Sequence, residues 1–143
     1  SQHAGLRVVV DAYTLKGAAV FAVTSTGELV ERTPTGLWAE HGHPEGAPLA
    51  ASPGVVLRDT NAMGSLFLRT QSGQLVERWW CNDDWEWRWV DHGAPPGTTL
   101  VTAPGALVNA SSLFVVGADG TLRRRHWSPA AGAWEWSSHG RPP

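Results

Sequence analysis

Three segments of the chain repeat one short pattern at a nearly constant interval. In each, a Phe follows Val or Leu, a Gly comes six residues after the Phe, and an Arg comes five residues after the Gly. The phenylalanines stand 46 and 47 residues apart, and the glycines keep the same intervals; they are Phe21, Phe67, Phe114, Gly27, Gly73 and Gly120. A fixed period of this length is typical of folds built from repeated supersecondary units.

A second marker closes each repeat. It is a Trp followed three residues later by His-Gly, and it spans 38–42, 89–93 and 136–140. The turn glycine and the histidine are 14 residues apart in the first copy and 19 apart in the other two, so the first copy is shorter by five residues. We therefore divide the single domain, 1–143, into repeats at approximately 5–50, 51–101 and 102–143.

Each repeat reads as four short strands. Short apolar runs at 7–10, 55–57 and 106–108 form the first strands, and the Phe-containing runs form the second. A tight turn at glycine leads to the third strand, and the fourth ends at His-Gly. Alternation is clearest where Trp85, Trp87 and Trp89 are predicted to share one strand face, as Trp134 and Trp136 do. Because no long segment has a helical period, we predict an all-β chain.

A unit of about 47 residues with four strands is typical of a β-propeller blade. We therefore predict three four-stranded blades in this chain. Propellers have at least four blades, so the chain would be a half-propeller or a fragment. Either a homodimer closes a six-bladed ring by twofold symmetry, or the remainder of a longer propeller completes it. The alternative is a β-trefoil, which also has three repeats of four strands and closes within one chain.

This repeat pattern, with its Arg, its Trp-x-Trp and its His-Gly, resembles the tectonin-like and PLL-type β-propeller lectins over nearly the whole chain. More distantly, it is similar to the fungal fucose-binding propeller lectins, in which an Arg and a Glu hold the sugar. Glu31 and Glu77 match that Glu, whereas Ala19 and Ser65 stand at the Arg positions. The resemblance implies sugar pockets between neighbouring blades, with fucose or a methylated sugar as candidate ligands.

Nine tryptophans in 143 residues support the same expectation. An aromatic face stacks on the apolar face of a pyranose, while nearby polar groups bond its hydroxyls. The candidate ligand-binding residues therefore combine hairpin tryptophans with recurring polar side chains. They are Trp79, Trp80, Trp85, Trp87, Trp127, Trp134, Arg78, Arg125, His126, Glu31, Arg32 and Glu77.

Structural interpretations stand beside these functional ones. A tryptophan that recurs at one fixed position, as Trp38, Trp89 and Trp136 do, packs blade against blade more often than it binds a ligand. The recurring arginines also suit a salt bridge or a stack on a neighbouring Trp. The histidines before each closing glycine lie on different blades, so we expect turn-capping roles rather than a shared metal ion.

Several function classes are not indicated. The net charge is −2 and no long basic run exists, which argues against duplex nucleic-acid binding. No apolar run is long enough to span a membrane. No catalytic motif or recurring acidic pair appears, and the single tyrosine, Tyr13, is predicted in an early loop.

We expect a non-catalytic lectin-like module without metal or cofactor; the alternative is a protein-interaction scaffold without a sugar ligand. The lone Cys81 favours an intracellular location, with secretion left open.

Overall fold

The computed structural model describes residue 7 and residues 9–15, 19–50, 54–56, 65–102, 105–106 and 112–143. Within these residues the chain forms β-strands and no helix, which confirms the all-β prediction. The strands are β1 (Val9–Leu15), β2 (Ala19–Thr24), β3 (Leu29–Arg32), β4 (Trp38–Gly42), β5 (Gly54–Val56), β6 (Ser65–Arg69), β7 (Leu75–Cys81), β8 (Glu86–Gly93), β9 (Gly105–Ala106), β10 (Ser112–Val116), β11 (Leu122–Ser128) and β12 (Ala133–Gly140). The sequence Asn109-Ala110-Ser111, a potential N-glycosylation sequon, lies outside the described residues.

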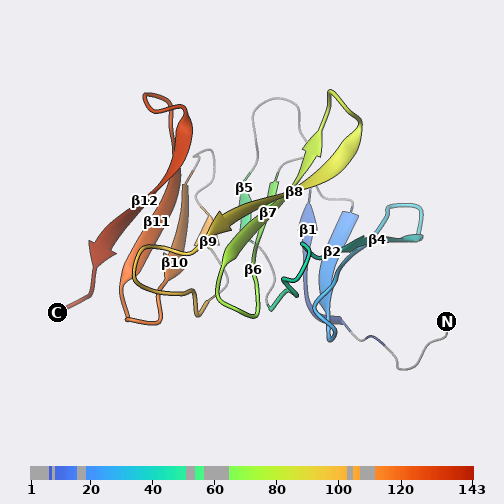
Figure 1. The fold of residues 1–143 in the computed structure, drawn as a ribbon. Coiled ribbons are helices and arrows are strands. Elements are labelled where there is room, and N and C mark those ends of the chain that lie inside the picture. Colours follow the sequence, from blue (N-terminus) through green and yellow to red (C-terminus); the bar gives the residue numbers. More distant parts are fainter. Residues whose placement is uncertain are drawn as a thin grey trace.

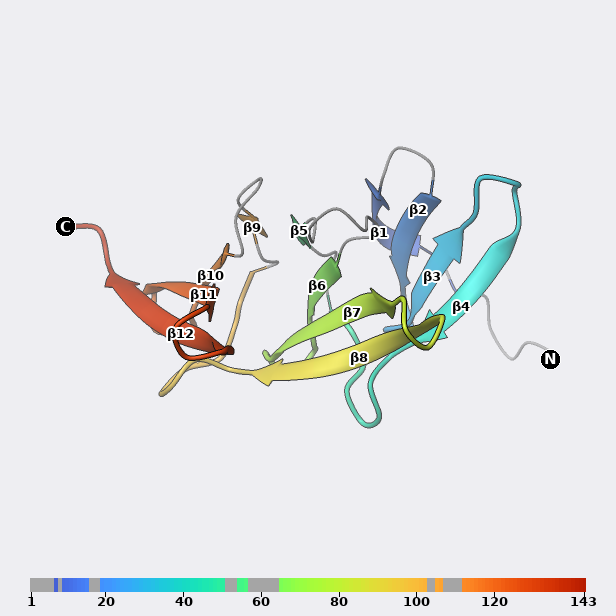
Figure 2. The ribbon, with the colours of Figure 1, turned by 90° about the horizontal axis from the view of Figure 1, so that it is seen from above.

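The strands form three separate antiparallel sheets, each in simple sequential order. Sheet 1 is β1-β2-β3-β4, sheet 2 is β5-β6-β7-β8, and sheet 3 is β9-β10-β11-β12. Figure 2 shows them following one another across the molecule, with β1, β5 and β9 on one side and β4, β8 and β12 on the other. The described strands do not form the closed barrel that a β-trefoil requires.

The predicted strand positions need two corrections at the N-terminal end of each repeat. The first strand runs over Val9–Leu15 rather than 7–10, and Tyr13 lies within it instead of in a loop. The strands β5 and β9 begin one residue earlier than predicted, at Gly54 and Gly105. The shortened first repeat is confirmed, since β3 and β4 have four and five residues where β7 and β8 have seven and eight.

The apolar core lies between sheets, because alternate residues of each strand point to opposite neighbours. Leu66 and Leu68 of sheet 2 pack against Phe21 and Leu29 of sheet 1, while Phe67, between them, packs against sheet 3. All five side chains are at most 1% exposed. Sheet 2 is therefore buried on both faces, and each interface stabilises its two sheets together.

The segments that connect the sheets run close over the turn glycines. The amide of Leu49 donates to the Gly27 carbonyl at 2.8 Å, and Leu100 donates to Gly73 at the same distance. The φ angle of Gly27 is 80°, and a Cβ there would lie 2.8 Å from the Pro48 Cβ. Glycine is thus required both for the backbone conformation and for the close approach of the next segment.

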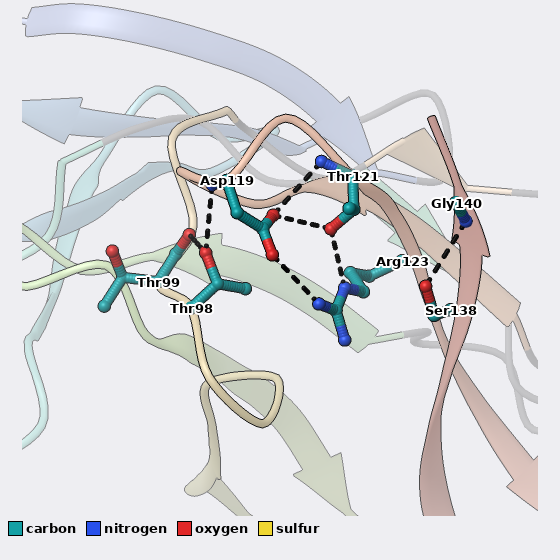
Figure 3. Close-up of polar contacts among 7 residues, drawn as sticks. All are labelled: Thr98, Thr99, Asp119, Thr121, Arg123, Ser138 and Gly140. Carbon is teal, nitrogen blue, oxygen red and sulfur yellow. Dashed lines mark hydrogen bonds and ion pairs between the residues drawn. The ribbon is translucent and has the colours of Figure 1, made fainter. Parts of the chain in front are cut away.

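The turn of the third repeat is held by a different polar cluster, shown in Figure 3. The Asp119 carboxylate accepts hydrogen bonds from the Thr121 hydroxyl at 2.6 Å and from the Arg123 guanidinium at 3.1 Å. These bonds, led by that of Thr121, lower the pKa of Asp119. The Asp119 amide in turn donates to the Thr98 hydroxyl at 3.2 Å, which ties the turn to the segment entering sheet 3.

Candidate functional site

The β7–β8 hairpin carries a cluster of three tryptophans, and in Figure 1 this hairpin extends well beyond the shorter β3–β4 hairpin. Trp80 lies edge-to-face with Trp85 at 5.9 Å between ring centroids and with Trp87 at 5.7 Å. Trp87 packs inward on sheet 1, whereas Trp85 is 78% exposed. The cluster therefore extends from Trp87 at the core to the solvent-exposed indole of Trp85.

Trp85 is not the strand residue that we predicted. It lies in the turn before β8, so it does not share a strand face with Trp87 and Trp89. Its φ angle is 54°, which makes it a non-glycine residue in the left-handed region, whereas Gly132 holds the matching place in the next hairpin with φ 64°. An L side chain in this conformation costs about 1–2 kcal/mol. Strain of this kind concentrates at functional positions.

A second aromatic group lies on the β11–β12 hairpin. Trp127, which is 41% exposed, stands edge-to-face with Trp134 at 6.0 Å. On the opposite face of β11 from Trp127, the His126 Nε2 lies 3.6 Å from a Glu135 carboxylate oxygen. Both groups of tryptophans thus occur where the long hairpins leave the sheets.

Trp79 lies on the opposite face of β7 from Trp80. The Arg88 guanidinium is 6.0 Å from the centre of the Trp79 ring and forms ion pairs with Asp84 and Glu86. An indole bordered by a guanidinium and carboxylates is the combination that can stack on a sugar ring and bond its hydroxyls.

The recurring Glu, His and Arg form one network across the interface between sheets 1 and 2. The Glu31 carboxylate lies 2.9 Å from His41 Nε2, and the Arg78 Nε–H donates to His41 Nδ1 at 3.1 Å. Since Nδ1 accepts, the imidazole is neutral and carries its proton on Nε2, which donates to Glu31. The imidazole therefore relays a hydrogen-bond chain from the carboxylate of one sheet to the guanidinium of the next.

The same network recurs between sheets 2 and 3. Glu77 lies 2.9 Å from His92 Nε2, and the Arg125 Nε–H donates to His92 Nδ1 at 3.1 Å. Here the Glu77 side chain is fully buried and that of His92 is 1% exposed. Two interfaces with the same atoms at the same distances make this a repeated structural unit.

Aromatic rings enclose each network. The His41 ring stands edge-to-face with Trp87 at 5.1 Å, and His92 does so with Trp134 at 5.2 Å. The Arg78 guanidinium stacks over Trp89 at 4.8 Å. Burial lowers the pKa of Arg78 to about 10, so it stays charged at neutral pH. Trp87, Trp89 and Trp134 therefore pack at the interfaces between sheets, together with the arginines. The packing role expected of the recurring tryptophans fails for Trp38, whose side chain is 57% exposed.

The predicted site residues fall into two sets. The network between sheets holds the recurring polar residues and two tryptophans, namely Glu31, Glu77, Arg78, Arg125, Trp87 and Trp134. The long hairpins hold the other candidates Trp79, Trp80, Trp85, Trp127 and His126. Arg32 belongs to neither set, since it is exposed and stacks over Trp38 at 5.3 Å.

The expected turn-capping role of the histidines is wrong for His41 and His92. Their rings instead bond to the neighbouring sheet. Sequence reasoning missed this role, although a usable signal existed. Each Glu, His and Arg recurs at matching repeat positions, and residues from successive repeats meet at an interface.

Within the described residues, no three potential ligand side chains form a group that could hold a metal ion. The same residues include no helix with the length and apolar character needed to cross a membrane. No protein-family model matches the chain, and no curated protein matches it.

Proposed function

We propose that the chain is a carbohydrate-binding module of a β-propeller, acting without catalysis and without a cofactor. The observation that carries this proposal is Trp85, a 78% exposed indole in a strained turn conformation beside Trp80. A glycine at this place would relieve the strain, as Gly132 does in the next hairpin. A solvent-exposed aromatic platform is what a pyranose ring requires.

The propeller arrangement is part of the same proposal. Three successive antiparallel sheets that repeat one interface support it, and so does the proximity of β5 to β9 on one side of the molecule. A complete ring needs further sheets, from a second copy of the chain or from further repeats. Several weak sugar sites on one ring would then bind a multivalent glycan surface more tightly than any one site.

The ligand chemistry that suits these residues is a neutral sugar. Trp85 would stack on the apolar face of such a sugar, as Trp127 would at the second hairpin. On the other face of β7, Arg88 and its carboxylate partners would bond the hydroxyls of a sugar stacked on Trp79. A fucose or a methylated sugar presents such an apolar face. The fungal type of fucose site is not favoured, because Ser65 replaces its Arg and is fully buried.

The test is a glycan array followed by titration with the free sugar that competes best. Trp85→Gly should abolish or strongly reduce binding, while its thermal stability should equal or exceed that of the wild type because the strain is relieved. Trp85→Tyr keeps an aromatic ring and should retain part of the affinity. Unchanged binding by Trp85→Gly would refute the site, and a blank array with folded protein would refute the function.

A protein-interaction scaffold is the second candidate. It is favoured by the use of Arg78, Arg125, Glu31 and Glu77 in contacts between sheets, which leaves fewer polar groups for a sugar. A co-purifying protein partner in the absence of any glycan response would support it.

A further inference from the structure

One face of sheet 3 is exposed at the positions that are buried in the other two sheets. Leu122 is 39% exposed, whereas the matching Leu29 and Leu75 are fully buried. His139 is exposed and Phe114 half-buried, and their ring centroids lie 5.6 Å apart at an interplanar angle of 60°, close to the 51° and 50° of the matching pairs in the other repeats. We call the side of sheet 3 with Phe114, Leu122, Arg124 and His139 the open face.

The open face continues an interface that the molecule already uses twice. The matching side chains of sheet 1 contact sheet 2; they are Phe21, Leu29 and His41. The matching side chains of sheet 2 contact sheet 3; they are Phe67, Leu75 and His92. The Phe and His of sheet 3 already have the geometry that receives a neighbour. A further β-sheet is therefore the partner whose shape fits this face.

The open face differs from the two used interfaces in its charge. Arg124 stands where sheets 1 and 2 have glutamate, directly opposite Phe114 in the strand register. Its Nε and Nη2 donate to the Ser112 hydroxyl at 3.0 and 2.8 Å, which holds the guanidinium beside the open face. In the used interfaces the glutamate offsets the positive charge of the incoming arginine, whereas Arg124 would repel one.

We propose that the open face is an interaction surface for a β-sheet that presents a carboxylate where sheets 2 and 3 present Arg78 and Arg125. The carboxylate would pair with Arg124 across a contact otherwise made by Phe114 and Leu122. A second copy of this chain fits poorly, because its first sheet offers Arg32 at that position. The charge pattern therefore favours a distinct acidic sheet over closure by an identical chain.

The experiment extends the full chain by a sheet of known docking geometry. A copy of residues 43–93, which contains sheet 2 and its lead-in segment, is joined after Gly140, either unchanged or with Arg78→Glu in the copy. Amide hydrogen exchange of β11 and the fluorescence of the added tryptophans report whether the extra sheet docks. Each extension is made in the wild-type host and in an Arg124→Glu host.

In the wild-type host, the Arg78→Glu copy should slow exchange in β11 by at least about tenfold more than the unchanged copy. In the Arg124→Glu host the preference should reverse, since the charges are then exchanged. Equal protection by both copies in both hosts would overturn the charge selectivity. Protection by neither copy in either host would overturn the open face as a docking surface.

Discussion

The buried carboxylate of Glu77 gives the sharpest test of the network between sheets. Glu77→Gln keeps the shape of the side chain and its acceptor oxygen but removes the negative charge. The Glu77 side chain is fully buried, and the His92 imidazole separates it from the Arg125 guanidinium. The substitution therefore isolates the charge from the packing.

The expected magnitude follows from this geometry. A carboxylate and a guanidinium at opposite ends of one imidazole lie roughly 8 Å apart and attract by about 2 kcal/mol at an effective dielectric constant of about 20. Replacing a charged acceptor by a neutral one weakens its hydrogen bond by roughly 1 kcal/mol. Relief of the buried charge offsets part of this loss, so the free energy of unfolding should fall by about 2 kcal/mol.

The assay is urea unfolding followed by tryptophan fluorescence, with the single variants Glu77→Gln and Arg125→Gln and the double variant. The cycle should give a coupling energy of about 2 kcal/mol. Glu135→Gln is the control, because that half-exposed carboxylate also faces a histidine and should cost less than about 0.5 kcal/mol. A loss for Glu77→Gln no larger than the control, or a coupling near zero, would refute the electrostatic reasoning.

Three further predictions concern pH, a turn and the core. Burial, followed by the charge of the neighbouring Arg78, lowers the pKa of His41. The neutral His41 side chain therefore contributes to stability above the unfolded-state pKa of about 6.5. This contribution is lost as the pH falls through the lower pKa of the folded state. The urea midpoint should therefore fall on acidification below about pH 6.5, and less steeply in His41→Gln. Gly27→Ala should lower the thermal midpoint more than Gly120→Ala, because both have positive φ but a Cβ on Gly120 meets nothing closer than 3.9 Å; equal shifts would argue against the close approach at Gly27. Leu75→Ala should cost roughly 2–5 kcal/mol by urea unfolding, and the exposed Leu122→Ala well under 1 kcal/mol; similar costs would contradict the exposure of the open face.

Much of the fold could be predicted from sequence because its signals are local and repeated. The interval between Phe21 and Phe67 and the glycines after them place the second and third strands of each repeat. The first strands were less predictable, since β5 and β9 are short and apolar runs alone do not define where pairing begins. Tyr13 was assigned to a loop for the same reason.

The network between sheets was less predictable, because its contacts join residues from different repeats. The family resemblance drew attention to Glu31 and the repeat pattern to Arg78, but neither could show that His41 lies between them. The spacing of Trp85 to Trp87 predicts a strand residue, whereas Trp85 lies in the turn before β8 with a φ angle of 54°. Local periodicity does not encode a turn whose last residue is left-handed.

The relay between sheets also ties the evolution of one repeat to that of the next. Glu31 and His41 belong to the first repeat, whereas their partner Arg78 belongs to the second. A single repeat therefore does not contain all the residues of one network. A whole repeat can be duplicated without loss, because each copy brings both halves. A substitution at one half must be matched about one repeat length away, and such paired changes should appear as covariation between neighbouring repeats rather than within them.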